Sequence, residues 1–170
     1  LPLLTLVRLA RWGDVLEETA GAGAAERTPG MFEYARGIAL VRTGRVAETE
    51  VMVVSLDERV RTARTAAKPD DDLAKMMAER LATLSSQLKA EFAFARGDVD
   101  AALGAGREAI LAEEAMGGEP PLLAGGSQVA LGDLFLRARR YPEAEAAFRV
   151  DLALQPGSGW ALRGLQVAVA

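Results

Sequence analysis

The sequence predicts an all-α fold, an α-α superhelix of about three and a half stacked helical hairpins plus a closing helix. Aromatic residues make up only 5% of the 170 residues, while Ala and Leu abound, which favours helices over a β-sandwich. Apolar residues recur at i, i+3, i+4 and i+7 between Leu131 and Ala138, the spacing of one helix face. The predicted turns at Ala10 and Gly44 lie 34 residues apart, which indicates a repeat of hairpins.

The first predicted hairpin covers residues 1–20. Its two short helices are separated by an expected turn at residues 11–13. Asp14 is expected to cap the second helix, because Asp is a preferred N-cap residue. The stretch over residues 21–30 is rich in Gly and Ala and ends in Thr-Pro-Gly, so it is expected to be a loop.

The second predicted hairpin covers residues 31–66, with Gly44 in the turn and a second helix that starts at Val46. Four residues share one face of its first helix: Tyr34, Gly37, Ile38 and Val41. The segment 51–56, with the sequence VMVVSL, has the composition of a strand, so a strand remains an alternative there. A helix is favoured because the hairpin needs one at this point.

The third predicted hairpin covers residues 70–116, with a turn at Gly97 and a helix cap at Asp98. Three consecutive aspartates at residues 70–72 precede its first helix. They are interpreted as an N-cap followed by acids that the helix dipole favours, and a cation site is the less favoured alternative.

The fourth predicted hairpin covers residues 122–155 and follows an expected loop at residues 117–121. A closing helix without a partner is expected over residues 159–169, as is common at the end of helical arrays. The whole chain is predicted to be one domain. Its first residue is Leu rather than Met, so we expect it to be a piece of a longer protein.

The most specific pattern lies in residues 129–156. Small, large and helix-breaking residues occur there at fixed offsets: Leu131, Gly132, Phe135, Tyr141, Ala144, Phe148 and Pro156. Gly132 and Ala144 are expected to face each other where two helices cross, and Pro156 is expected to end the second helix. This pattern, L-G-x-x-Y…A-x-x-x-F…P, resembles the tetratricopeptide repeat family. It departs from the family at Gln128, where a Trp is usual, and at Arg139, where a turn Gly is usual.

The resemblance implies a right-handed array in which the first helix of each hairpin lines a concave groove for an extended or helical peptide. The repeat register places ten residues there: Tyr34, Ile38, Val41, Arg42, Gln87, Glu91, Phe94, Asp133, Leu136 and Arg137. An alternative places Ile38, Val41 and Phe94 in the core. The Lys and Asn set with which some family members hold a chaperone's C-terminal carboxylate is absent from these positions.

Composition excludes several classes of site. The chain has no Cys and no His, so disulfides, thiolate nucleophiles, zinc sites and imidazole bases are excluded. Its 20 basic and 24 acidic residues are interleaved, with a net charge of −4, and no basic stripe predicts nucleic-acid binding. No apolar run approaches the ~18 residues of a membrane span. The Gly-Ala-Gly-x-x-Ala motif at residues 104–109 lies in a helical pattern, so no cofactor site is predicted.

We therefore expect a non-enzymatic scaffold or adaptor that binds a peptide or partner domain, with no catalytic residues, cofactor or metal. Two alternatives remain. One is a ligand-sensing regulatory module of a larger bacterial protein, and the other is a structural or homodimerisation domain. A bacterial source is expected from the heavy use of Ala and Arg, and a cytoplasmic location is favoured.

Overall fold

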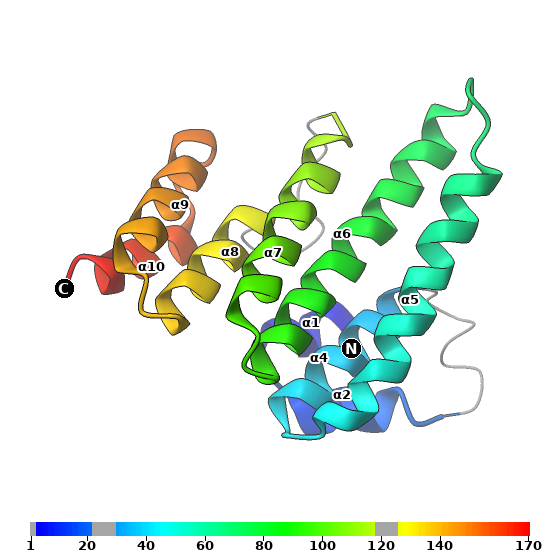
Figure 1. The fold of residues 1–170 in the computed structure, drawn as a ribbon, viewed down its shortest axis with the longest axis horizontal. Helices are drawn as coiled ribbons and strands as arrows, with labels where there is room; N and C mark the ends of the chain where they lie inside the picture. The colour runs from blue at the N-terminus through cyan, green and yellow to red at the C-terminus, as the bar shows by residue number, and fades with distance from the viewer. Residues whose placement is uncertain (1–2, 22–29, 118–125) are drawn as a thin grey trace.

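The computed structural model describes residues 3–21, 30–117 and 126–170, which form an all-helical fold without a strand (Figure 1). The helices in chain order are α1 (Leu3–Arg8), α2 (Trp12–Glu18), α4 (Met31–Arg42), α5 (Val46–Ala66), α6 (Asp72–Ala95), α7 (Val99–Glu114), α8 (Gly126–Arg137), α9 (Tyr141–Leu154) and α10 (Gly159–Ala168). The predicted all-α class is confirmed for these residues. None of their helices combines the length and the apolar character needed to cross a bilayer.

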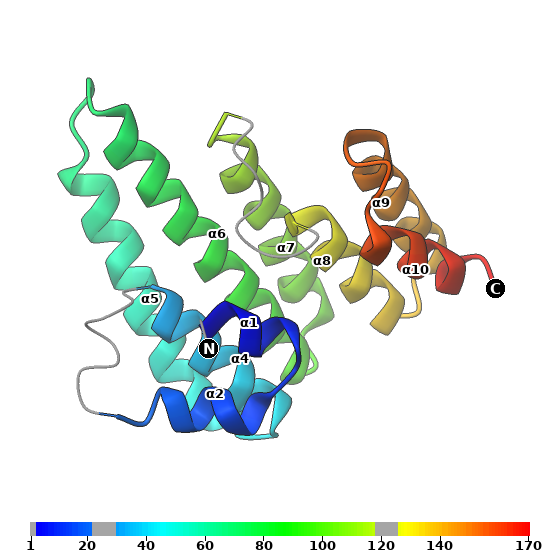
Figure 2. The same ribbon diagram turned by 180° about the vertical axis from the view of Figure 1, so that it is seen from behind.

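The helices pack in a repeated order along a row. Each helix packs against the next one in the chain, and the first helices of the hairpins also pack against one another, α1 on α4, α4 on α6, α6 on α8 and α8 on α10. Among the described helices, the second helices α2, α5, α7 and α9 make no comparable contacts with each other. Figure 2 shows the row from behind, with α1 and α2 toward one end and α10 at the other. The fold is therefore a repeat-like helical array.

Four hairpin turns end with the same backbone hydrogen bonds. One residue in each turn has a positive φ: Ala10 (53°), Gly44 (78°), Gly97 (82°) and Arg139 (59°). The amide of the following residue donates to the carbonyl five residues before it, as from Arg45 N to Leu40 O at 2.8 Å. This Schellman arrangement satisfies carbonyls that the end of a helix leaves unpaired. The first of these turns lies at residues 9–11. It matches the turn position at Ala10 from which the 34-residue spacing was counted, and it lies earlier than the turn expected at residues 11–13.

Aspartate caps begin two of the long helices. The Asp71 and Asp98 carboxylates each accept a hydrogen bond from the amide three residues further on, at 2.9 and 3.0 Å, as predicted. The predicted cap at Asp14 is wrong. Helix α2 begins earlier, at Trp12, with Arg11 in the N-cap position and no side-chain cap bond. Asp14 lies instead in the first turn, where it pairs with Arg11. Its negative charge interacts favourably with the positive end of the helix dipole there.

The segment 51–56 is part of α5, so the strand alternative is wrong. Its apolar residues occupy different sides of the helix, because Val51 and Val54 are exposed while Leu56 is fully buried. A helical period places Leu56 against α4 and α6, in a cluster with Tyr34 and Leu88. The surrounding hairpin has overridden the local strand preference.

Three predicted features lie partly or wholly outside the described residues. Most of the loop expected at residues 21–30 lies there, and so do most of the loop expected at 117–121 and the helix start expected near residue 122. Within the described part, α8 is helical from Gly126 and α10 ends at Ala168.

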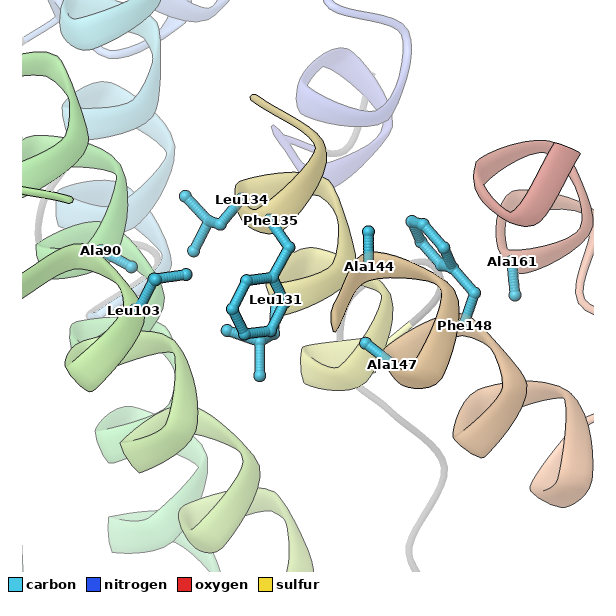
Figure 3. Packing of buried hydrophobic residues seen from close by; sticks show 9 residues of the cluster. All are labelled: Ala90, Leu103, Leu131, Leu134, Phe135, Ala144, Ala147, Phe148 and Ala161. Atoms are coloured by element: carbon cyan, nitrogen blue, oxygen red, sulfur yellow. The ribbon is translucent and has the colours of Figure 1, made fainter. Parts of the chain in front are cut away.

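Phe148 of α9 fills the space between α8 and α10 (Figure 3). A Cβ atom on Gly132 would lie 2.5 Å from the Phe148 ring, and one on Gly164 would lie 2.3 Å from it. Both positions therefore admit only glycine unless the ring moves. The sequence predicted that Gly132 would face Ala144. Helices α8 and α9 do pack against each other, and a Cβ on Gly132 would lie nearest to the Phe148 ring, while the contact with Ala144 stays a prediction.

Candidate functional site

A groove of about 490 Å³ runs along the array on the side of the first helices. Its walls come from α1, α4, α6, α8 and α10, with Phe148 of α9 at its base. This set of helices is the one whose members pack directly against each other. The groove therefore extends over all the hairpins and the closing helix.

The groove residues follow a spacing that can be counted back from each hairpin turn. Three positions recur in the first helices, at ten, six and two residues before the positive-φ residue of the turn. They are Tyr34, Ile38 and Arg42 in α4; Gln87, Glu91 and Ala95 in α6; and Val129, Asp133 and Arg137 in α8. The shorter helix α1 has the last two of these positions, Leu4 and Arg8. Most of these side chains line the groove. Residues four apart lie on the same face of an α-helix, so a common register at each turn aligns the same face of each first helix.

Four charged side chains from three hairpins form one network in the groove. The Glu91 carboxylate of α6 accepts hydrogen bonds from Arg42 of α4 at 3.0 Å and from Arg137 of α8 at 2.8 and 3.1 Å. Arg137 also pairs with Asp133 on its own helix at 3.0 Å. Ion pairs of this partly exposed kind contribute at most about 1 kcal/mol each to stability. Their main effect is to fix the positions of the side chains that a ligand would meet.

A neutral hydrogen-bond chain lies beside this network. The Tyr34 hydroxyl donates to Gln87 Oε1 at 3.5 Å, and Gln87 Nε2 donates to Ser127 Oγ at 3.0 Å. The Ser127 amide in turn donates to Glu113 of α7 at 2.6 Å. Burial raises the pKa of Tyr34 well above its usual range, and the negative charge of Glu91 adds to this effect. Tyr34 therefore stays a neutral hydroxyl donor at the base of the groove.

A recess of about 170 Å³ continues from the groove toward the core. It shares Tyr34, Gln87 and Glu91 with the groove and is otherwise walled in part by small residues, among them Gly106 and Ala109 of α7. Small side chains at these positions keep space open that larger ones would fill. The middle of the groove therefore continues inward between α4, α6 and α8.

The structure brings most of the predicted groove residues together. Those that line the groove are Tyr34, Arg42, Gln87, Glu91, Asp133 and Leu136. Arg137 is joined to them through Glu91 and Asp133. Ile38 is only 5% exposed, belongs to the core and reaches the recess. Val41 and Phe94 do not line the groove, and Phe94 lies under the Arg137 guanidinium at 4.4 Å.

Sequence reasoning missed the two ends of the groove. Arg8 on α1 and Trp160, Arg163 and Val167 on α10 all line it. Arg8 lies two residues before the Ala10 turn, the same place that Arg42 has before the Gly44 turn. Applying the register to the first hairpin would have found Arg8. For α10 no turn follows within the described helices from which to count, so the register offered no signal there.

The arrangement is suited to holding a ligand in place. It combines apolar surface from Val129, Leu136 and Trp160 with charged groups whose positions are set by ion pairs. Among the described residues, no group of three or more acidic side chains is placed to hold a metal ion. Comparisons of the chain with protein-family models, with curated proteins and with solved structures find no significant match.

Proposed function

We propose that this chain is a divergent tetratricopeptide-like protein whose groove binds a segment of a partner protein and catalyses no reaction. The observation that carries the proposal is the shared register of the groove. Successive first helices present the same positions, counted from equivalent turns, along one continuous hollow. Such a surface matches a ligand that extends along the array and meets several hairpins in turn.

The repeat assignment is supported by packing and by backbone geometry together. First helices contact first helices, while second helices contact their own hairpin partner and the next first helix. All four turns have a residue with positive φ at the same position and the same backbone hydrogen bonds. The residue pattern of α8 and α9 adds the family resemblance at the level of sequence.

A second candidate function is the sensing of a small ligand within a larger bacterial protein. The recess favours it, because Tyr34, Gln87 and Ser127 place polar atoms in an otherwise mostly apolar space. Ligand sites commonly combine apolar walls with a few such polar groups. The recess alone is small, so this ligand would also occupy the open groove.

Partner capture with matched variants tests the binding proposal. The immobilised chain would be incubated with lysate of its source, and retained proteins identified by mass spectrometry. Trp160→Ala removes an aromatic ring that lines the groove and is 54% exposed. Tyr141→Ala is the control, because Tyr141 is 45% exposed and does not line the groove. We expect one or a few proteins that the wild type and the control retain and Trp160→Ala loses.

Equal retention by all three chains would contradict the groove as the binding surface. Loss of retention together with an altered circular dichroism spectrum would point to misfolding, so spectra of all three are recorded first. Light scattering of the same samples shows whether the retained partner is a second copy of this chain.

A further inference from the structure

The groove carries positive charge although the chain as a whole is acidic. Four arginines line or adjoin it, Arg8, Arg42, Arg137 and Arg163, against two carboxylates, Glu91 and Asp133. This is an excess of two positive charges in a chain whose net charge is −4. The surplus therefore reflects where the arginines lie and not the composition of the protein.

The surplus positive charge lies at the two ends of the groove. Glu91 and Asp133 are already engaged by Arg42 and Arg137 in the middle. Arg8 of α1 and Arg163 of α10 are exposed, and neither makes an ion pair with another described residue. A ligand that runs along the groove would meet a compensated centre between two cationic ends.

Apolar side chains line the groove between these ends. Leu4 and Val7 lie beside Arg8, and Trp160 and Val167 lie beside Arg163. Tryptophan and arginine are the residues most enriched among those that dominate binding energy at protein interfaces. An anion alone would not use this apolar surface, and nucleic acid would need many more cations along its backbone.

We infer that the occupant of the groove is an acidic segment of a partner protein, with side-chain carboxylates at Arg8 and Arg163 and at least one large apolar side chain between them. This inference rests on the proposed function and names the chemistry of the partner. The charge complementarity would also speed association and make it sensitive to salt. The recess by Tyr34 and Gln87 is the place for the apolar side chain, since buried apolar residues such as Ile38, Leu131 and Leu134 also line it.

Selection from a random 12-residue peptide library displayed on phage tests the inference. Display with the peptide's C-terminus joined to the coat protein leaves only side-chain carboxylates as anions. We expect enriched peptides with net negative charge and a large apolar residue. The best peptide is then synthesised with a C-terminal amide and a fluorescent label, and its Kd is measured by anisotropy at low and high NaCl.

Two double variants with the same charge change separate the groove from general electrostatics. Arg8→Glu with Arg163→Glu reverses both ends of the groove and should weaken the peptide at least about tenfold. Arg96→Glu with Arg107→Glu is the control, because these arginines are exposed, lie outside the groove and make no ion pair with a described residue. The control should change the Kd less than about twofold, and higher salt should weaken the wild-type complex.

The possible failures are distinguishable. Enriched peptides that are neutral or basic, and that Trp160→Ala still weakens, would overturn the acidic occupant and leave groove binding intact. If the Kd of the peptides is unchanged by Trp160→Ala and by both double variants, or if no peptide is enriched, the groove function is overturned as well. Competition of the peptide by a labelled single-stranded DNA at equal concentration would overturn the protein occupant in favour of nucleic acid.

Discussion

Two helix junctions of the array, one in the second hairpin and one at the closing helix, are held by different side chains. Between α4 and α5, the Glu33 carboxylate is only 2% exposed and accepts hydrogen bonds from three donors. These are the Gly30 amide at 2.8 Å, the Arg59 guanidinium at 2.5 Å and the Ser55 hydroxyl at 3.3 Å. At the C-terminal junction, between α8 and α10, one aromatic ring fills the space, that of Phe148 on α9 (Figure 3). A Cβ on Gly132 of α8 or on Gly164 of α10 would collide with this ring.

The comparison shows that one backbone arrangement can be stabilised by unlike side chains. A buried carboxylate stabilises only when its donors are all present, so it holds a particular geometry. A buried ring stabilises in proportion to the volume it fills. The α4–α5 junction should therefore respond to a change of hydrogen-bonding group, and the C-terminal junction to a change of size. Each of the following predictions tests one side of this contrast.

The largest effect is expected from Phe148→Ala. Removing the ring leaves a cavity among α8, α9 and α10, and changes of this kind destabilise by about 3–5 kcal/mol. Urea denaturation followed by circular dichroism measures the change. Leu154→Ala on the same helix removes a side chain that is 77% exposed, and it should change stability by less than about 0.5 kcal/mol. Similar losses in both variants would show that the ring does not organise this junction.

A smaller effect is expected from Glu33→Ala at the α4–α5 junction. The Gly30 amide would lose its buried acceptor, while the partly exposed Arg59 would recover water. A loss of about 1–3 kcal/mol follows from an unsatisfied buried group. Glu33→Gln keeps the size and one acceptor oxygen, so it should lose clearly less in the same denaturation assay. If Gln is as damaging as Ala, charge matters here more than the hydrogen bond to the backbone.

A pair of glycine variants tests the size-dependence of the C-terminal junction. Gly164→Ala would place a Cβ 2.3 Å from the Phe148 ring, whereas a Cβ on Gly104 of α7 meets no atom within 4 Å. Overpacking of this sort costs about 1–3 kcal/mol, less the helix propensity gained. Gly104→Ala should instead stabilise by up to about 1 kcal/mol. The melting temperature should fall in Gly164→Ala and rise in Gly104→Ala, relative to the wild type. A higher melting temperature for Gly164→Ala would contradict the packing at this position.

The sequence allowed the all-helical class and the residues in the middle of the groove to be predicted because these depend on local signals. Turn residues, caps and helical periodicity identified the hairpins, and the register placed Tyr34, Gln87 and Asp133 in the groove. These signals lie within one or two helical turns of the residue concerned. The strand-like segment at 51–56 shows their limit, since its conformation is decided by α4 and α6 packing on α5.

The ends of the groove depend on contacts that no local pattern contains. Arg163 reaches the groove because the α9–α10 connection and the Phe148 ring set how α10 lies on α8. The same ring explains why position 132 admits only glycine, which the sequence pattern attributed to Ala144. Residue spacing shows which positions share a helix face, but the rotamer of a large side chain decides which small residue it covers.

The smallest effects are expected at the turns, where the two ends of the array are alike. Ala10 and Arg139 both have a positive φ, a conformation that is unfavourable for residues with a Cβ and easy for glycine. Ala10→Gly and Arg139→Gly should each stabilise by roughly 0.5–1 kcal/mol, the relief of strain less the greater entropy of glycine in the unfolded chain. Gly97→Ala, at the matching turn of the third hairpin, should lose a similar amount. Equal increases in the free energy of unfolding at Ala10 and Arg139 would show that the turn geometry is independent of the side chains that hold each junction. An increase at only one of the two would mean that packing in that hairpin imposes the strain on its turn.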